Sequence, residues 1–190
     1  MKVVAFNGSP RKNGNTSLMI NHVLKVLENE GIDCETINLA GNIKRGCTAC
    51  LRCRESKEKR CYYDDDIVNS CVEKMLEADG IIIGSPTYFA DVTAETKALI
   101  DRAGYVAKGN GDLLKRKVGA AVAPARRAGA MNVLQTINNF FFINGMIVPG
   151  STYWNLGLAK DPGDVDSDQE GVATMSELGS NIAWLIKKIK

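Results

Sequence analysis

Short apolar runs alternate along this chain with segments in which apolar residues recur every three or four positions. The runs are typical of buried strands, and the wider spacing is typical of helices that pack one face on a core. Gly31 is expected to end the first helix, because glycine readily adopts the left-handed conformation that closes a helix. Strands are predicted at residues 2–6, 34–39, 80–84, 117–123 and 146–148. Helices are predicted at 17–29, 92–104, 130–144 and 167–189, and a further helix begins at residues 64–66 and ends at about residue 78.

This alternation of strands and helices predicts an α/β fold with a doubly wound, five-stranded parallel sheet. Parallel neighbours need crossover connections, and these are nearly always right-handed. Ligands of such folds bind beyond the carboxyl ends of the strands, so we expect the loops after strands one, three and four to form one site. The chain shows no internal repeat and no linker, which indicates a single domain over residues 1–190 with a cysteine-rich loop at about 44–63.

The charge and hydropathy of the chain argue against two classes of protein. With 24 Lys plus Arg and 22 Asp plus Glu, the net charge is only +2, far from the basicity of a general nucleic-acid binder. No apolar stretch approaches the roughly 20 residues that span a bilayer, and the first apolar run ends at Asn7 before it resembles a signal peptide. We therefore expect a cytoplasmic protein that binds neither nucleic acid nor membrane.

The loop after the first predicted strand has the composition of a phosphate site. Over residues 7–17, glycines allow backbone N–H groups to approach a ligand, and the start of the next helix adds partial positive charge. The loop lacks the spacing of the triphosphate and dinucleotide motifs, which favours a monophosphate. The alternative is a structural turn whose polar residues only cap the helix. The candidate groups are the hydroxyls of Ser9, Thr16 and Ser17 and the cations Arg11 and Lys12.

The loop after the third predicted strand offers a surface for a flat ring. Pro86 stiffens the turn, and Tyr88 and Phe89 present apolar rings against which a tricyclic ligand can pack. Alternatively, these aromatic residues only cover the end of the sheet. The presence of two such loops at one edge favours a flavin with its phosphate.

Three motifs carry a family resemblance. They are Gly8-Ser9-Pro10-Arg11 with Gly14-Asn15-Thr16, then Gly84-Ser85-Pro86-Thr87-Tyr88-Phe89, and then Lys97-x-x-Ile100-Asp101-Arg102. In these motifs the chain resembles the NADPH-dependent FMN reductase and iron–sulfur flavoprotein family of the flavodoxin-like superfamily. The resemblance covers most of residues 1–150 and implies a flavodoxin-like fold with strand order 2-1-3-4-5.

The same resemblance implies FMN as a cofactor and indicates which residues hold it. We expect no catalytic acid or base, because the protein supplies position and electrostatics while the cofactor supplies the chemistry. The implied phosphate ligands are Ser9, Arg11, Asn15, Thr16 and Ser17; the residues that line the isoalloxazine ring are Pro86, Thr87, Tyr88 and Phe89; and the loop that closes over the ring runs from Ala123 through Arg126 and Arg127 to Gly129.

Four of the six cysteines follow the spacing Cys47-x2-Cys50-x2-Cys53-x7-Cys61. A loop with three thiolates at this spacing can wrap a cubane cluster, and the fourth thiolate returns after a short excursion. Structural zinc sites more often pair two separated knuckles, so the spacing favours iron–sulfur ligation over zinc. Zinc, an empty thiol site and a labile disulfide remain alternatives. The family resemblance implies a [4Fe-4S] cluster.

Basic residues outnumber acidic ones around these cysteines. A cluster held by four thiolates is anionic, so basic surroundings stabilise it and can guide an acidic electron carrier toward it. The alternative is a solvated charged loop. The basic residues are Lys44, Arg45, Arg52, Arg54, Lys57, Lys59 and Arg60, against the acidic Glu55 and Glu58.

The predicted function is that of an FMN-dependent oxidoreductase or electron-transfer flavoprotein that passes electrons between a [4Fe-4S] cluster and FMN. One alternative is a cluster-free NAD(P)H-dependent FMN or quinone reductase, and others are a non-enzymatic electron carrier, a redox sensor and a nucleotide-binding module without redox chemistry. The resemblance implies a ferredoxin-like protein or NAD(P)H as the electron donor, and a homodimer or homotetramer. Structural roles are expected for Cys34, Cys71 and His22.

Overall fold

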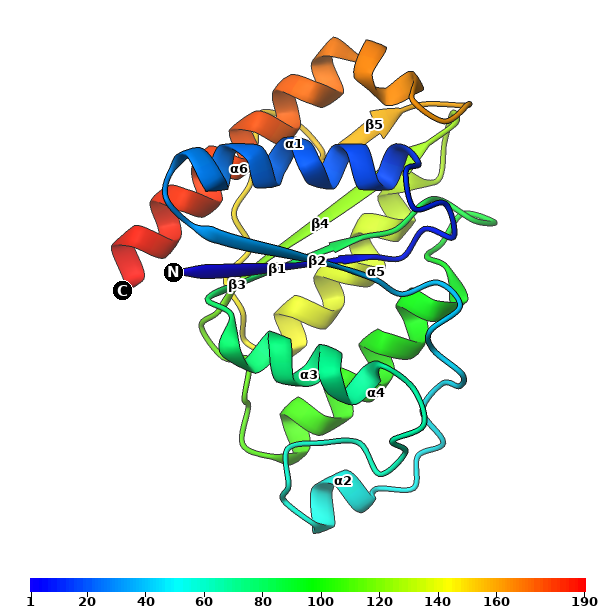
Figure 1. The fold of residues 1–190 in the computed structure, drawn as a ribbon, viewed down its shortest axis with the longest axis vertical. Coiled ribbons are helices and arrows are strands. Elements are labelled where there is room, and N and C mark those ends of the chain that lie inside the picture. The colour runs from blue at the N-terminus through cyan, green and yellow to red at the C-terminus, as the bar shows by residue number, and fades with distance from the viewer.

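The computed structural model describes residues 1–190 and contains a five-stranded parallel sheet with the strand order β2-β1-β3-β4-β5 (Figure 1). This is the order of flavodoxin-like folds, so the predicted fold class is confirmed. The strands are β1 (Lys2–Asn7), β2 (Asp33–Asn38), β3 (Gly80–Gly84), β4 (Val118–Ala125) and β5 (Leu156–Leu158). The helices are α1 (Asn15–Asn29), α2 (Arg52–Glu55), α3 (Val68–Glu77), α4 (Ala94–Gly109), α5 (Ala130–Ile143) and α6 (Gln169–Ile189), and a 3-10 helix η1 spans Asp164–Ser167.

Helices cover both faces of the sheet, and each face has its own hydrophobic core (Figure 1). Helices α1 and α6 pack on one face, and α3, α4 and α5 pack on the other. Strand β3 contributes to both cores, because successive side chains of a strand point to opposite faces. Ile82 packs with α1 and α6, whereas Ile81 and Ile83 pack with α3 to α5. This two-sided burial explains the unbroken apolar run in the sequence.

The predicted fifth strand at residues 146–148 is wrong. Two separate segments pair with β4 at this edge of the sheet, and only the second of them is a strand. Ile147 makes a single parallel bridge with Val118, at the start of β4. Pro149 follows, and the chain then leaves the sheet, since proline has no N–H with which to continue the pairing. The edge resumes only at β5, which pairs with residues 123–125 of β4.

Several element boundaries also differ from the prediction. Helix α1 begins at Asn15, before the predicted start at residue 17, with Gly14 as its N-cap, so Thr16 lies inside the first helical turn. Strand β4 continues to Ala125, beyond the predicted end at residue 123. Helix α4 begins after Thr93, whose side chain accepts the N–H of Thr96 as an N-cap, and the short helices α2 and η1 were not predicted. No helix combines the length and the apolar character that crossing a membrane requires.

Candidate functional site

The loop after β1 is built around a glycine that admits no side chain. Gly8 donates its N–H to the carbonyl of Gly84 (2.8 Å), at the end of β3. A Cβ at Gly8 would lie 1.9 Å from the hydroxyl of Thr96, in the first turn of α4. The Gly8 carbonyl in turn accepts the hydroxyl of Thr93 (2.9 Å). The predicted phosphate loop is therefore held against the loop after β3, as the expectation of a joint site requires.

Side-chain oxygens shape the rest of this loop. The Asn7 side chain accepts the N–H of Ser9 (3.0 Å), and the Ser9 hydroxyl accepts the N–H of Arg11 (3.1 Å). Ser9 is buried, and its hydroxyl hydrogen remains free to donate because the contact with Arg11 uses only a lone pair. Arg11 is exposed. The loop thus carries the buried hydroxyl of Ser9 and two exposed cations, Arg11 and Lys12.

Thr16 adds an unsatisfied polar atom to this loop. Its side chain is 1% exposed, and its hydroxyl has no hydrogen-bond partner in the structure. Buried polar atoms in folded proteins nearly always have a partner, so an isolated hydroxyl at a helix N-terminus points to a missing acceptor. A phosphate oxygen has the required chemistry. The residues present therefore fit a bound monophosphate.

Asn15 is committed to a different contact. Its side-chain N–H donates to the carbonyl of Asp161 (2.9 Å), and its side-chain oxygen accepts the N–H groups of Gly163 (2.9 Å) and Val165 (3.4 Å). Both ends of the amide thus tie the segment around η1 to the start of α1. A role for Asn15 and for the half-buried Ser17 in phosphate binding stays a prediction.

The loop after β3 presents its aromatic rings to solvent. Tyr88 and Asp91 exchange backbone hydrogen bonds (2.9 and 3.1 Å), which closes a tight turn. Phe89 and Ala90 inside this turn have positive φ angles of 48° and 64°, a conformation that is unfavourable for residues other than glycine. Phe89 is fully exposed and Tyr88 about half exposed. Such a strained, aromatic loop tip is a surface prepared for a ligand or a partner.

The loop after β4 packs directly on the aromatic loop. Thr87 donates both its N–H and its hydroxyl to the carbonyl of Pro124 (3.2 and 3.1 Å). Gly129 has a φ of 93°, and a Cβ there would lie 2.9 Å from the Thr87 side chain. Ala123, by contrast, lies within β4 with its side chain fully buried in the core, and its place at the ring stays a prediction. The exposed part of this loop begins at Arg126.

The structure brings the four cysteines of the predicted cluster loop together. Cys47, Cys50, Cys53 and Cys61 all line one small pocket. Burial raises the pKa of the Cys53 thiol, and the negative charges of the three other cysteines raise it further. No three cysteine, histidine or carboxylate side chains stand in coordination geometry, so the thiols are neighbours and not a preformed cage. The donor set nevertheless fits a thiophilic metal centre.

Three aromatic rings enclose this cysteine pocket, and each ring carries an arginine. Tyr62, Tyr63 and Tyr105 are among the residues that line the pocket. Their arginine partners are Arg52 over Tyr62 (3.9 Å to the ring centre), Arg45 over Tyr63 (4.6 Å) and Arg54 over Tyr105 (5.2 Å). The arginines on these rings place positive charge close to the pocket. Three of the basic residues around the cysteines therefore stack on rings that line the pocket.

A buried arginine, Arg102, also lines the cysteine pocket, and the sequence alone did not predict this position. The Arg102 side chain, on α4, is 1% exposed. Its Nε donates to the sulfur of Cys61 (3.4 Å), and its Nη1 contacts the carboxylate of Asp66 (2.5 Å). It also donates to the carbonyls of Arg45 (3.3 Å) and Tyr63 (3.0 Å). Only the Lys97-x-x-Ile100-Asp101-Arg102 motif could have drawn attention to it.

Asp66 is the buried counter-charge of Arg102. Burial by itself raises the pKa of the Asp66 carboxyl. The hydrogen bond from Arg102 and two backbone N–H groups outweigh burial and hold the pKa below its ordinary value. The carboxylate is therefore charged at neutral pH. One of those N–H groups is that of Val68, the first residue of α3, so Asp66 also holds the start of this helix.

Two asparagines fix the cysteines through the backbone. Asn69, on α3, accepts the N–H of Cys61 (2.7 Å) and donates to the carbonyls of Cys61 (3.1 Å) and Tyr63 (3.2 Å). Asn110, after α4, donates to the carbonyl of Cys53 (2.9 Å) and accepts the N–H of Lys59 (3.2 Å). The two half-buried cysteines are thus anchored to helices, whereas Cys47 and Cys50 are exposed.

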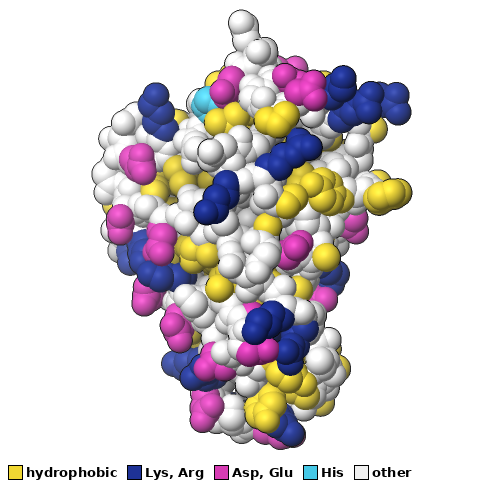
Figure 2. All heavy atoms as spheres, turned by 45° about the vertical axis from the view of Figure 1, so that its right-hand side comes forward, with side chains coloured by type: hydrophobic (Ala, Val, Ile, Leu, Met, Phe, Trp, Pro, Cys, Tyr) yellow, Lys and Arg dark blue, Asp and Glu magenta, His cyan; other side chains and the backbone are white.

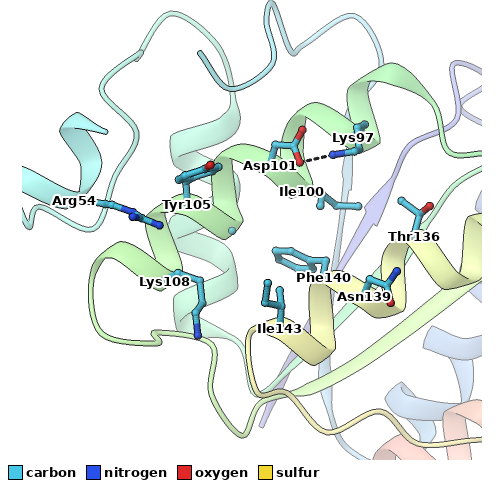
Figure 3. A pocket seen from close by; sticks show the side chains of 11 residues that line it. Arg54, Lys97, Ile100, Asp101, Tyr105, Lys108, Thr136, Asn139, Phe140 and Ile143 are labelled. Carbon is cyan, nitrogen blue, oxygen red and sulfur yellow. Dashed lines mark hydrogen bonds and ion pairs between the residues drawn. The ribbon is translucent and has the colours of Figure 1, made fainter. Parts of the chain in front are cut away.

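A groove of about 560 Å³ lies beside the cysteine pocket, between α4 and α5 (Figure 3). Its floor is apolar and includes Ile100 and Phe140. Arg54 and Tyr105 stand at one end, and Tyr105 also lines the cysteine pocket. The groove is lined by three cations, of which Lys97 is paired with Asp101, Lys108 is paired with Asp112, and Arg54 has no carboxylate partner. An acidic molecule in this groove would lie next to the cysteine pocket.

Apolar side chains are also exposed on the opposite side of α5. Figure 2 turns the carboxyl edge of the sheet partly toward the viewer and shows exposed apolar groups scattered among basic ones. Phe142, Tyr153 and Trp154 are each more than half exposed and line one shallow cavity. An apolar area of this kind is typical of a contact surface.

The fold, the phosphate-type loop and the aromatic loop beside it define a flavodoxin-like flavoprotein. The chain belongs to the NADPH-dependent FMN reductase family, whose model matches residues 1–161. It is 42% identical to an iron–sulfur flavoprotein of Methanocaldococcus jannaschii over the full length of both chains. It is 34% identical to an iron–sulfur flavoprotein of Methanosarcina thermophila, covering all of this chain and 97% of the relative.

A solved structure shares the fold at lower identity. The crystal structure of RosB with a bound 8-demethyl-8-formylriboflavin-5'-phosphate superimposes with a TM-score of 0.79 at 22% identity. The match covers all of this chain and 80% of RosB. It therefore supports the fold, while the family membership rests on the closer relatives and the family model.

Proposed function

We propose that this chain is an FMN-dependent oxidoreductase that passes electrons between FMN at the carboxyl edge of the sheet and a [4Fe-4S] cluster on Cys47, Cys50, Cys53 and Cys61. The observation that carries the proposal is the single pocket lined by all four cysteines, with a buried guanidinium at its base. The relatives named iron–sulfur flavoproteins support it, because they match the chain over its whole length.

The proposed FMN seat combines the three loops of the carboxyl edge. The hydroxyls of Ser9, Thr16 and Ser17, together with Arg11, would bind the phosphate, and the unpartnered Thr16 hydroxyl supports this assignment most directly. The ring would lie on the loops at residues 86–89 and 126–129, which pack on each other. When bound, FMN supplies the conversion between two-electron and one-electron chemistry. The chain itself would orient the ring.

We further propose a homodimer or homotetramer. In one chain the cysteine loop runs from the end of β2 to α2, away from the carboxyl edge of the sheet (Figure 1). The exposed area around Phe142, Tyr153 and Trp154 offers a contact surface. A second copy can bring one chain's cysteine pocket near the other chain's flavin.

The experiment that tests the proposal is purification without oxygen, followed by the visible spectrum and the iron, sulfide and FMN content. We expect flavin bands, broad cluster absorption and about four irons per chain, as for a cubane on four cysteines. Flavin without iron would favour the cluster-free NAD(P)H-dependent FMN or quinone reductase. A protein that cannot be loaded with FMN would contradict both functions.

For the electron donor we propose an acidic one-electron carrier of ferredoxin type that docks at the groove of Figure 3, with NAD(P)H as the alternative. Lys97→Glu with Lys108→Glu is expected to slow reduction by such a carrier about tenfold at low salt, because charge attraction accelerates association. The measurement is the second-order rate constant over a range of ionic strength. The control is Lys25→Glu with Lys188→Glu, which changes exposed lysines on α1 and α6 at the other face of the sheet.

Equal effects of the two double variants would show that only net charge matters and would contradict docking at the groove. Fast reduction by NAD(P)H, with no response to the acidic carrier, would replace this donor by the nicotinamide.

A further inference from the structure

We propose that Arg102 is a positioning residue of the cysteine pocket, which fixes the Cys61 sulfur and offsets the negative charge that four thiolates gather there. The inference rests on the proposed function and deepens it, because it concerns how the chain tunes the centre that its cysteines would hold. It predicts that Arg102 raises the reduction potential of that centre.

The burial of Arg102 is itself unusual. Arginine is almost never fully buried unless it is paired, since its charge loses the favourable contact with water. Arg102 is the largest fully buried side chain of the protein, and Asp66, its partner, has a fully buried side chain as well. A pair of apolar residues would fill the same space at less cost. The retained charge therefore indicates a task that packing alone does not perform.

The hydrogen bonds of Arg102 indicate that its charge acts on the cysteine loop. The guanidinium has five N–H donors in a fixed fork, and its partners lie in the segment from Arg45 to Asp66. Arg45 precedes the first cysteine, and Tyr63 follows the fourth. A single side chain thus joins both ends of the cysteine loop.

The contact with Cys61 distinguishes Arg102 from the other supports of the loop. Arg102 is the only residue whose side chain donates a hydrogen bond to a cysteine sulfur. The Asn69 side chain also binds this cysteine, but it is uncharged and contacts only the backbone N–H and carbonyl of Cys61. The charge of Asp66 is shared with the backbone N–H groups of Lys44 and Val68, so it does not simply cancel the guanidinium at the sulfur.

The position of Arg102 affects the reduction potential of the centre, because each electron added to the centre adds negative charge beside the guanidinium. Hydrogen bonds to the sulfurs, net charge and solvent exposure set the potentials of iron–sulfur centres. A buried cation 3.4 Å from a ligand sulfur acts in a medium of low dielectric, where its effect is large. It therefore favours the reduced state of the centre.

The test compares Arg102→Met, Arg102→Lys and Asn69→Ala in the full-length protein, reconstituted with iron and sulfide without oxygen. The readout is the midpoint potential of the iron–sulfur signal by electron paramagnetic resonance, with the potential of FMN in the same sample as the internal reference. We expect Arg102→Met to shift the cluster potential downward, Arg102→Lys to shift it less because the charge is kept, and Asn69→Ala to lower cluster content without a shift. The FMN potential should stay constant throughout.

If Arg102→Met fails to fold, Asp66→Asn with Arg102→Met carries the test, because removing both members of a buried ion pair is tolerated better than removing one. Its potential should also fall, since the donor to Cys61 is gone. A fully loaded variant with an unchanged potential overturns the inference, as does an equal shift in Asn69→Ala. Wild-type protein that takes up no iron overturns the proposed function and the inference together.

Discussion

Replacing Cys47 and Cys50 together by serine is expected to remove the iron and sulfide from the anaerobically purified protein and to leave its FMN in place. Both cysteines are exposed, so their loss does not disturb the core. Two of four thiolate ligands would be missing, and serine is a poor ligand for iron–sulfur centres, which are held by cysteine thiolates. The measurement is the iron, sulfide and FMN content of variant and wild type purified side by side.

Cys34→Ser is the matched control, because Cys34 lies in β2 and outside the cysteine pocket. Burial raises the pKa of the Cys34 thiol to about 11, so this cysteine stays protonated at neutral pH and is not available as a thiolate ligand. Cys34→Ser should keep both cofactors. Iron that persists in the double variant would exclude the two cysteines as ligands. Loss of FMN together with the iron would contradict the prediction that iron and FMN occupy separate sites.

The sequence predicted most of the fold because its signals were local. The isoleucines of β3 and the glycine-rich segments after the strands are effects of neighbouring residues, and they correctly indicated a parallel sheet. The fifth strand was placed wrongly because its position is not a local property. Residues 146–148 are apolar enough for a strand, but whether they form one depends on their pairing with β4. Continuous pairing with β4 begins only at Leu156.

The candidate site shows the same division. The cysteine spacing is a local pattern, and the structure indeed brings these residues to one pocket. Arg102 lies far along the chain from Cys61, and no periodicity connects them. Asn15 has the composition of a phosphate ligand, but its amide is used by the segment around η1, which is distant in sequence. Tertiary contacts of this kind leave no trace in a single sequence.

Thr16→Val is expected to weaken FMN binding while stabilising the protein without FMN. Valine keeps the shape of threonine but lacks the hydroxyl that has no partner in this structure. An unsatisfied buried hydroxyl costs about 1–3 kcal/mol, so its removal should raise the free energy of unfolding of the apoprotein by about 1 kcal/mol. A hydrogen bond to a charged phosphate contributes about 1.5–3 kcal/mol, so the Kd for FMN should rise roughly tenfold to a hundredfold. Urea unfolding of the apoprotein and fluorescence titration with FMN measure the two effects.

Thr174→Val is the control that separates these effects from the loss of any buried hydroxyl. Thr174 is equally buried on α6, but its hydroxyl is already bonded to that of Thr152 (3.2 Å). Its replacement should therefore destabilise the apoprotein and leave FMN binding unchanged. The opposite signs at the two positions follow from one difference, the presence or absence of a partner in the folded chain. If Thr16→Val also destabilises the apoprotein and binds FMN normally, its hydroxyl serves the fold, and the phosphate must be held by the remaining groups of the loop.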